Sequence, residues 1–79
     1  MAADPLANWT GEAVGEGVTT SPLYARAQPD INARSVALWQ MTETLLLWAE
    51  FDGWYLASSL LRRGEPVGWS SAAYIRRTL

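Results

Sequence analysis

Apolar residues in this chain occur in short runs that alternate with polar positions and are separated by Gly, Pro, Asp or Asn. No stretch sustains the three- and four-residue apolar spacing of an amphipathic helix. Short runs with alternating character and turn residues between them are typical of β-strands. The sequence therefore predicts an all-β fold, with strands at residues 17–20, 44–49, 54–58 and 67–70.

Four stretches between or after these runs predict the connections. Residues 50–53 read Glu-Phe-Asp-Gly, and the Asp-Gly pair supplies the positive φ that a tight hairpin requires. Residues 60–66 are polar and contain Gly and Pro, which predicts the loop of a second hairpin. Residues 21–35 hold two prolines and few strand formers, so we expect a long irregular surface connection there. Residues 71–75 predict a short 3-10 turn.

The length of the chain, 79 residues, allows one domain with one core. The longest uninterrupted apolar run, residues 45–49, is far shorter than the roughly 20 residues of a membrane-spanning helix, so we expect no membrane span. Residues 1–7 lack the basic and apolar segments of a secretory signal. We expect either synthesis in the cytosol or a signal already removed, and assembly into a virion or cell envelope stays open.

The inventory of side chains disfavours catalysis, because the chain has no His, the commonest general base, and no Cys, the readiest nucleophile. We therefore expect no enzyme activity, no metal site and no cofactor. The net charge is −2, although Arg62, Arg63, Arg76 and Arg77 make the carboxy-terminal end basic. Four clustered arginines in an acidic chain provide little positive charge for binding a phosphate backbone, which disfavours nucleic acid as a partner.

Three ordered signatures between residues 17 and 75 resemble the bacterial SH3 (SH3b) family. Residues 18–20 followed by Leu-Tyr-Ala-Arg at 23–26 look like the family's opening strand and its Leu-Asn-Val-Arg segment. Gly-Trp-Tyr at 53–55 looks like the family's own Gly-Trp-Tyr. Gly-Trp-Ser-Ser at 68–71 with Tyr-Ile at 74–75 looks like its terminal Gly-Trp-Val and Tyr-Leu.

The resemblance implies an SH3-like barrel of about five antiparallel strands over residues 17–79, with residues 1–16 as an amino-terminal extension. It also implies a binding module without a cofactor, in a family that binds peptidoglycan, peptides or partner proteins. The chain departs from the family pattern at Tyr24, Gln28, Trp39 and Thr42, and Thr42 stands at the place of a common turn glycine. The family register implies a structural core of Val18, Leu45, Leu47, Trp54, Leu56, Trp69 and Ile75.

Five tryptophans are many for so short a chain, and large rings fill cores or anchor binding. Because strand side chains alternate, an inward Leu45 places Leu46 and Trp48 on the outer face, and an inward Trp54 places Tyr55 there. An apolar outer face must be covered or available for binding. Three covers compete: the extension folding back through Leu6 and Trp9, a second copy of the chain, or another protein.

Two function hypotheses follow from these surfaces. The first is an assembly or interaction module that docks through Leu46, Trp48, Tyr55 and Trp9, either by self-association or onto a protein partner. The second is a cell-wall or peptide-binding module, associated with a hydrolase, whose groove presents Tyr24, Trp39 and Tyr74. Of the two, we expect the interaction module. A nucleic-acid-binding barrel ranks third.

Overall fold

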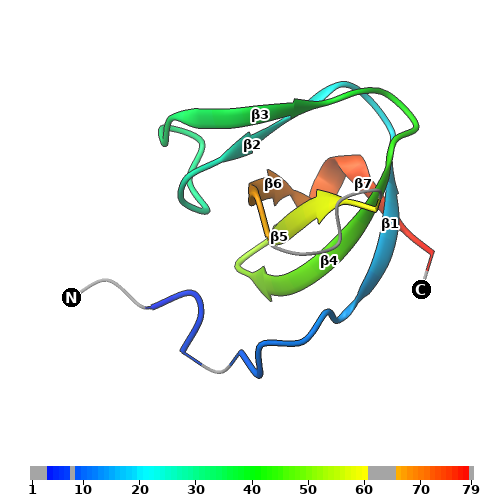
Figure 1. Cartoon of the computed structure of the whole chain (residues 1–79). Coiled ribbons are helices and arrows are strands. Elements are labelled where there is room, and N and C mark those ends of the chain that lie inside the picture. Colours follow the sequence, from blue (N-terminus) through cyan, green and yellow to red (C-terminus); the bar gives the residue numbers. More distant parts are fainter. Residues whose placement is uncertain (1–3, 8, 61–65, 79) are drawn as a thin grey trace.

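The computed structural model of the chain describes residues 4–7, 9–60 and 66–78, which form an all-β structure as predicted (Figure 1). Its elements are β1 (Gly15–Thr19), β2 (Leu23–Arg26), β3 (Ser35–Trp39), β4 (Thr44–Phe51), β5 (Trp54–Ser59), β6 (Gly68–Ser71), the 3-10 turn η1 (Ala72–Tyr74) and β7 (Ile75–Arg77). The expected 3-10 turn is present at η1. The described residues measure 36 × 26 × 20 Å along their principal axes.

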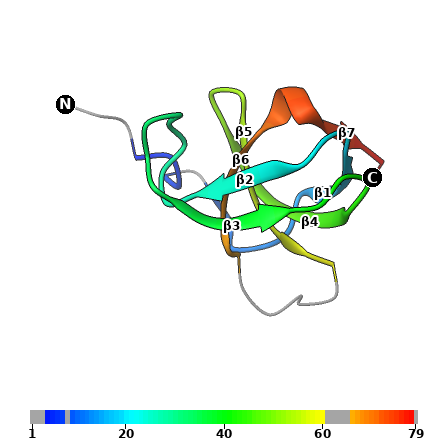
Figure 2. The same ribbon diagram turned by 90° about the horizontal axis from the view of Figure 1, so that it is seen from above.

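All seven strands belong to one antiparallel sheet in the order β3-β2-β6-β5-β4-β1-β7. The sheet is not closed, and β3 and β7 form its two edges, so the described residues do not confirm the expected five-stranded barrel. The sheet curls strongly, and the β2–β3 hairpin lies over the β4–β5–β6 ribbon when seen from two directions (Figures 1 and 2). The main core lies between these two parts.

The turn between β4 and β5 follows the local chemistry of Asp52 and Gly53. Both residues have positive φ, 50° and 82°, and Phe51 pairs with Trp54 as the last pair of the ladder. Two consecutive positive φ values are the requirement of the two-residue hairpin turn whose twist matches that of the strands. The predicted hairpin is confirmed. Thr42, in the turn before β4, also has positive φ, at 61°.

The prediction of an irregular connection over residues 21–35 is wrong in part: β2 lies inside it and pairs with β3, whereas residues 27–34 are irregular as expected. The register runs from Leu23 opposite Trp39 to Arg26 opposite Ser35, with an irregularity at Arg26. A strand of only four residues beside proline gives a weak sequence signal, and here its partner strand supplies the pairing. Most of the predicted loop at residues 60–66 lies outside the described residues. The strands on either side of it, β5 and β6, pair antiparallel.

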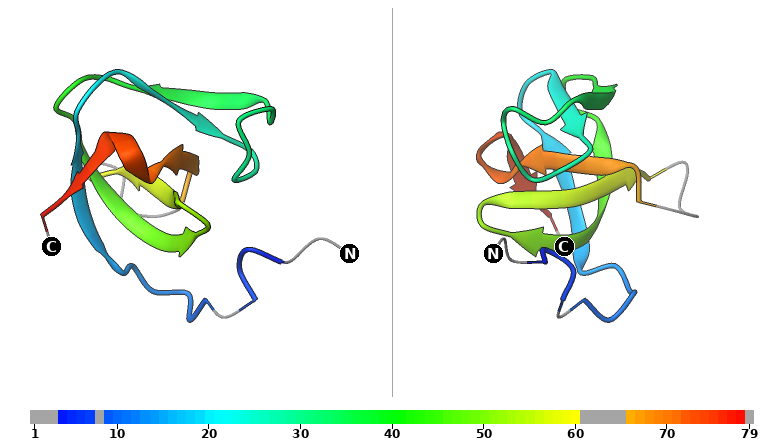
Figure 3. Two further views of the ribbon diagram at one scale, coloured as in Figure 1. Left: turned by 180° about the vertical axis from the view of Figure 1, so that it is seen from behind. Right: turned by 90° about the vertical axis from the view of Figure 1, so that its left-hand side faces the viewer.

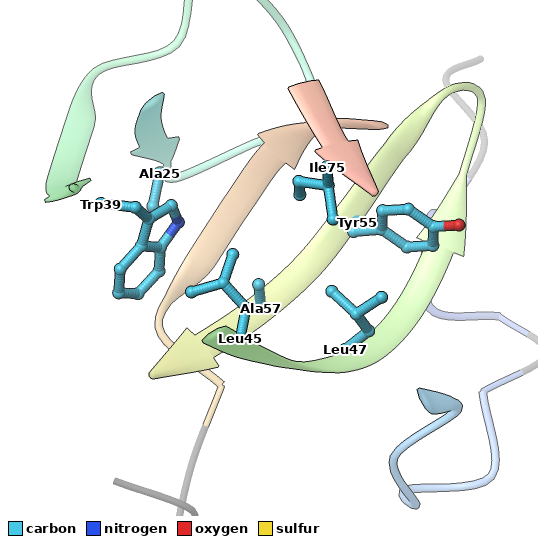
Figure 4. Packing of buried hydrophobic residues seen from close by; sticks show 7 residues of the cluster. All are labelled: Ala25, Trp39, Leu45, Leu47, Tyr55, Ala57 and Ile75. Atoms are coloured by element: carbon cyan, nitrogen blue, oxygen red, sulfur yellow. The ribbon is translucent and has the colours of Figure 1, made fainter. Parts of the chain in front are cut away.

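The main core contains Leu45 and Leu47 of β4, but its partners from β5 are Tyr55 and Ala57 (Figure 4). Trp54 and Leu56 were expected here and lie on the opposite face. The cause is a bulge at Trp48: Leu47 pairs with Ala57 and Ala49 pairs with Leu56, so Trp48 has no partner in the register. One extra residue reverses which side chains share a face beyond that point. The cluster comprises Ala25, Trp39, Leu45, Leu47, Tyr55, Ala57 and Ile75.

A second apolar layer lies on the outer face of the same ribbon. It is built on the buried residues Ala49, Leu56 and Trp69, with half-buried rings packed against it. Leu56 and Trp69 are thus buried, although not in the core to which they were assigned. The rings that pack on this outer layer are Trp9, Trp48, Phe51 and Trp54.

Strand β1 faces the core with Gly17 and Thr19, whereas Val18, expected in the core, is only half-buried. The close approach of β7 explains which residues of β1 face the core. A Cβ built on Gly17 would lie 2.6 Å from Cγ2 of Ile75 and 3.2 Å from the Arg76 carbonyl oxygen. Only glycine fits that inward position, so the larger Val18 side chain points the other way.

Candidate functional site

The extension before β1 folds back onto the outer layer, which was one of the three covers considered for that face (Figure 3). The rings of Trp9 and Trp48 are 6.3 Å apart and nearly perpendicular, at 89°. This edge-to-face contact is a favoured geometry for aromatic pairs. The Trp9 indole N–H donates to the Glu12 carbonyl, and the Val14 amide donates to the Leu47 carbonyl at 2.7 Å.

The expected docking face is therefore assembled differently from the prediction. Tyr55 is only 8% exposed and belongs to the main core, so its assignment to an outer face is wrong. Leu46 and Trp48 are half-buried, and Trp48 donates its indole N–H to the Ser58 hydroxyl at 2.9 Å. Trp9 is half-buried against Trp48. Of the three covers considered for this aromatic face, the structure shows the chain's own extension, which covers the face in part through Trp9.

Trp39 was expected in the ligand groove and lies in the main core instead, at 5% exposure. Its indole N–H donates to the Ser70 hydroxyl at 2.9 Å, and that hydroxyl donates to the Tyr24 carbonyl at 3.0 Å. The ring points inward because Trp39 alternates with the exposed Leu38 along β3. Trp39 is therefore linked to the backbone of Tyr24 through Ser70, and it does not line the groove.

A groove of about 320 Å³ brings together Tyr24, Trp54 and Tyr74 from three separate elements. Tyr24 is on β2, Trp54 begins β5 and Tyr74 ends η1. The two tyrosines are 50% and 51% exposed, so their rings are available to a ligand. Sequence reasoning found both tyrosines but missed Trp54, whose position beside the groove depends on the bulge in β4. The groove is lined by Ser21, Pro22, Leu23, Tyr24, Arg26, Ile31, Trp54, Ser71 and Tyr74.

Backbone hydrogen bonds fix the segments that carry these rings. The Ala72 amide donates to the Gly53 carbonyl at 2.8 Å, which joins the start of η1 to the turn before Trp54. The Thr20 amide donates to the Tyr74 carbonyl at 2.9 Å, which joins the end of η1 to the turn before β2. The three rings are thus mounted on connected elements, a condition for a preorganised binding site.

Arg26 is the charged residue of the groove lining and is half-buried. Its guanidinium Nη1 donates to the Ala33 carbonyl at 2.9 Å. The guanidinium carbon lies 5.7 Å from the centre of the Tyr24 ring, within the range of a cation–π contact. These two contacts hold the side chain at the groove, and neither partner is an anion.

A larger hollow of about 530 Å³ lies beside the extension, with Trp9, Phe51 and Arg77 among its lining residues. Arg77 donates to the Val14 carbonyl, and its guanidinium carbon lies 6.0 Å from the centre of the Tyr55 ring. The lining also includes the acidic residues Asp4 and Glu50. Its two rings, Trp9 and Phe51, are half-buried and pack on the outer layer, whereas the groove presents two half-exposed tyrosines.

Within the described ranges, no group of three or more His, Cys, Asp or Glu side chains could hold a metal ion. The same part of the chain contains no helix with the length and apolar character needed to cross a membrane. Comparisons of the chain with protein families, with curated proteins and with solved structures give no match. The chemistry of the groove is therefore the basis for assigning a function.

Proposed function

We propose that this chain is a non-catalytic, SH3-like binding module that holds a short extended peptide in the groove of Tyr24, Trp54 and Tyr74. The observation that carries the proposal is the convergence of three aromatic rings on one open groove, two of them half-exposed tyrosines. Aromatic-lined grooves of this kind suit extended and polyproline-type peptides, because stiff ligands lose little conformational entropy on binding.

The resemblance to the bacterial SH3 family is supported by the backbone at two positions. Thr42 occupies the place of the family's turn glycine, and its φ of 61° is of the kind that glycine adopts most readily. Gly53, which opens the Gly-Trp-Tyr signature, has a φ of 82°. These local requirements match the signatures, although the sheet is open and has seven strands.

Docking through the Trp48 face, the function that we expected first from the sequence, has less support in the arrangement of side chains. Tyr55 is absent from that face and Trp9 packs over Trp48. A partner at this face would have to compete with a contact the chain already makes. The groove needs no such displacement, so the peptide-binding hypothesis is the one that we retain.

The proposal is tested by selecting a random peptide library on the full chain and measuring the affinity of the selected peptides. Tyr24→Ala and Tyr74→Ala should each weaken binding by about tenfold or more, because aromatic anchors dominate such interfaces. Both side chains are half-exposed, so the melting temperature should change little. Met41→Ala, which removes an exposed apolar side chain that is not part of the groove lining, is the control.

Purified peptidoglycan forms a second arm of the same experiment. Retention that is lost in Tyr24→Ala would place the natural ligand in the cell wall. If neither the library nor peptidoglycan yields a ligand that depends on Tyr24 or Tyr74, the proposed function is wrong.

A further inference from the structure

We infer that the peptide held by this groove carries a carboxylate that pairs with Arg26, an inference that rests on the proposed function and specifies its ligand. Among the described residues, the lining of the groove contains one cation, Arg26, and no acidic residue. A ligand with a negative charge beside its apolar residues is therefore the complement of this surface.

The environment of Arg26 gives the first reason. The residue is half-buried, and its polar contacts in the described part of the chain are the Ala33 carbonyl and the Tyr24 ring. A guanidinium has five N–H donors, and the single hydrogen bond to Ala33 uses only one. A cation that is partly removed from water is stabilised most by an anionic partner. Neither the Ala33 carbonyl nor the Tyr24 ring is an anion.

The geometry of the side chain gives the second reason. Contacts on two sides, with a carbonyl at 2.9 Å and a ring centre at 5.7 Å, restrict the rotation of the long arginine side chain. A guanidinium held in place loses less entropy when it forms a bidentate pair with a carboxylate. The hydrogen bond to Ala33 also ties Arg26 to the loop between β2 and β3, where Ile31 lines the same groove.

The position of Arg26 predicts how the ligand is arranged. Tyr24 lies two residues before Arg26 on β2, and the guanidinium lies over its ring. A carboxylate bound at Arg26 is thus adjacent to whatever packs on Tyr24. The expected ligand has an apolar or proline residue on the tyrosines and an Asp or Glu close to it in sequence.

The test uses a synthetic array of extended, proline-rich peptides in which one position carries Asp, Glu, Asn or Gln in turn. Peptides are made with a free and with an amidated carboxyl terminus, which separates side-chain carboxylates from terminal ones. We expect the best acidic peptide to bind about tenfold more tightly than its amide analogue, a difference of ~1.4 kcal/mol. Only the acidic peptide should lose affinity as the salt concentration rises.

Arg26→Gln should reduce the preference for acid over amide to less than about twofold. Arg26→Lys keeps the positive charge but loses the planar guanidinium that can donate two parallel hydrogen bonds, so it should retain part of the preference. This variant replaces Arg26→Gln in the test if the Gln variant does not fold. Arg34→Gln removes an exposed arginine outside the groove lining and should leave the preference unchanged. Melting temperatures identify any variant whose fold has failed.

Each outcome decides between the inference and the proposed function. If peptides bind and depend on Tyr24, but acid and amide bind equally, the inference is wrong and the peptide-binding function stands. A preference that survives unchanged in Arg26→Gln and Arg26→Lys means that another group reads the carboxylate, which also overturns the inference. If no peptide of the array binds, and the selected library gives none either, both proposals fail together.

Discussion

Ser70 is the side chain whose removal should most clearly test how the groove is held together. Its hydroxyl accepts a hydrogen bond from the Trp39 indole at 2.9 Å and donates one to the Tyr24 carbonyl at 3.0 Å. Only Arg26 and Trp69 pair in the register between β2 and β6. The hydroxyl therefore joins three strands where the backbone ladder is shortest.

The expected cost of Ser70→Ala comes from the partners that lose their bonds. Ser70 is 0% exposed and Trp39 is 5% exposed, so water cannot readily replace the hydroxyl. A buried polar group left without a partner costs about 1–3 kcal/mol, and the indole N–H and the Tyr24 carbonyl are both affected. We expect a total loss of about 2–3 kcal/mol in the free energy of unfolding. At about 4–8 °C per kcal/mol, the melting temperature should fall by roughly 10–20 °C.

The measurement is thermal and urea unfolding of five proteins: the wild type, Ser70→Ala, Trp39→Phe, the double variant of these two, and a control. Because both changes remove the same hydrogen bond, the double variant should be more stable than additivity predicts, by about 1 kcal/mol. Ser35→Ala, the same substitution at an exposed site on β3, is the matched control and should change stability by less than about 0.5 kcal/mol. The reasoning is refuted if Ser70→Ala is as stable as the control, or if the two core changes are strictly additive.

Two further predictions concern the turn before β4 and the extension. Thr42 has a φ of 61°, and a β-branched residue with positive φ is strained. Thr42→Gly should relieve about 1–2 kcal/mol of backbone strain, and the greater entropy of glycine in the unfolded chain should offset about 0.5–1 kcal/mol of this gain. We therefore expect a small rise in the melting temperature. A fall would contradict the strain argument. Trp9→Ala removes the ring packed on Trp48 and should lower the free energy of unfolding by about 1–2 kcal/mol. The remaining indoles should also become more accessible, which acrylamide quenching of tryptophan fluorescence measures. Unchanged quenching would show that the extension does not cover the outer layer in solution.

The features that the sequence determined by itself are those with local causes. The Asp52-Gly53 turn was predictable because only a few residue types accept two consecutive positive φ values, and the structure has φ of 50° and 82° there. The all-β class followed from short alternating runs, and the short turn before Ile75 lies where residues 71–75 predicted it. Tyr24 and Tyr74 were expected to line a groove, and both do.

The features that only the tertiary structure decided depend on pairing between distant strands. Relative to the register expected without a bulge, the bulge at Trp48 exchanges the two faces of β5. Tyr55 therefore lies in the core and Trp54 lines the groove. Alternation along one strand cannot reveal an inserted residue. Trp39 lies in a core formed with residues distant in the sequence, and its indole donates to the Ser70 hydroxyl, 31 positions away. Local patterns specify turns and strand-forming segments, whereas the side chains that share one surface are decided by the register between segments, to which the whole chain contributes.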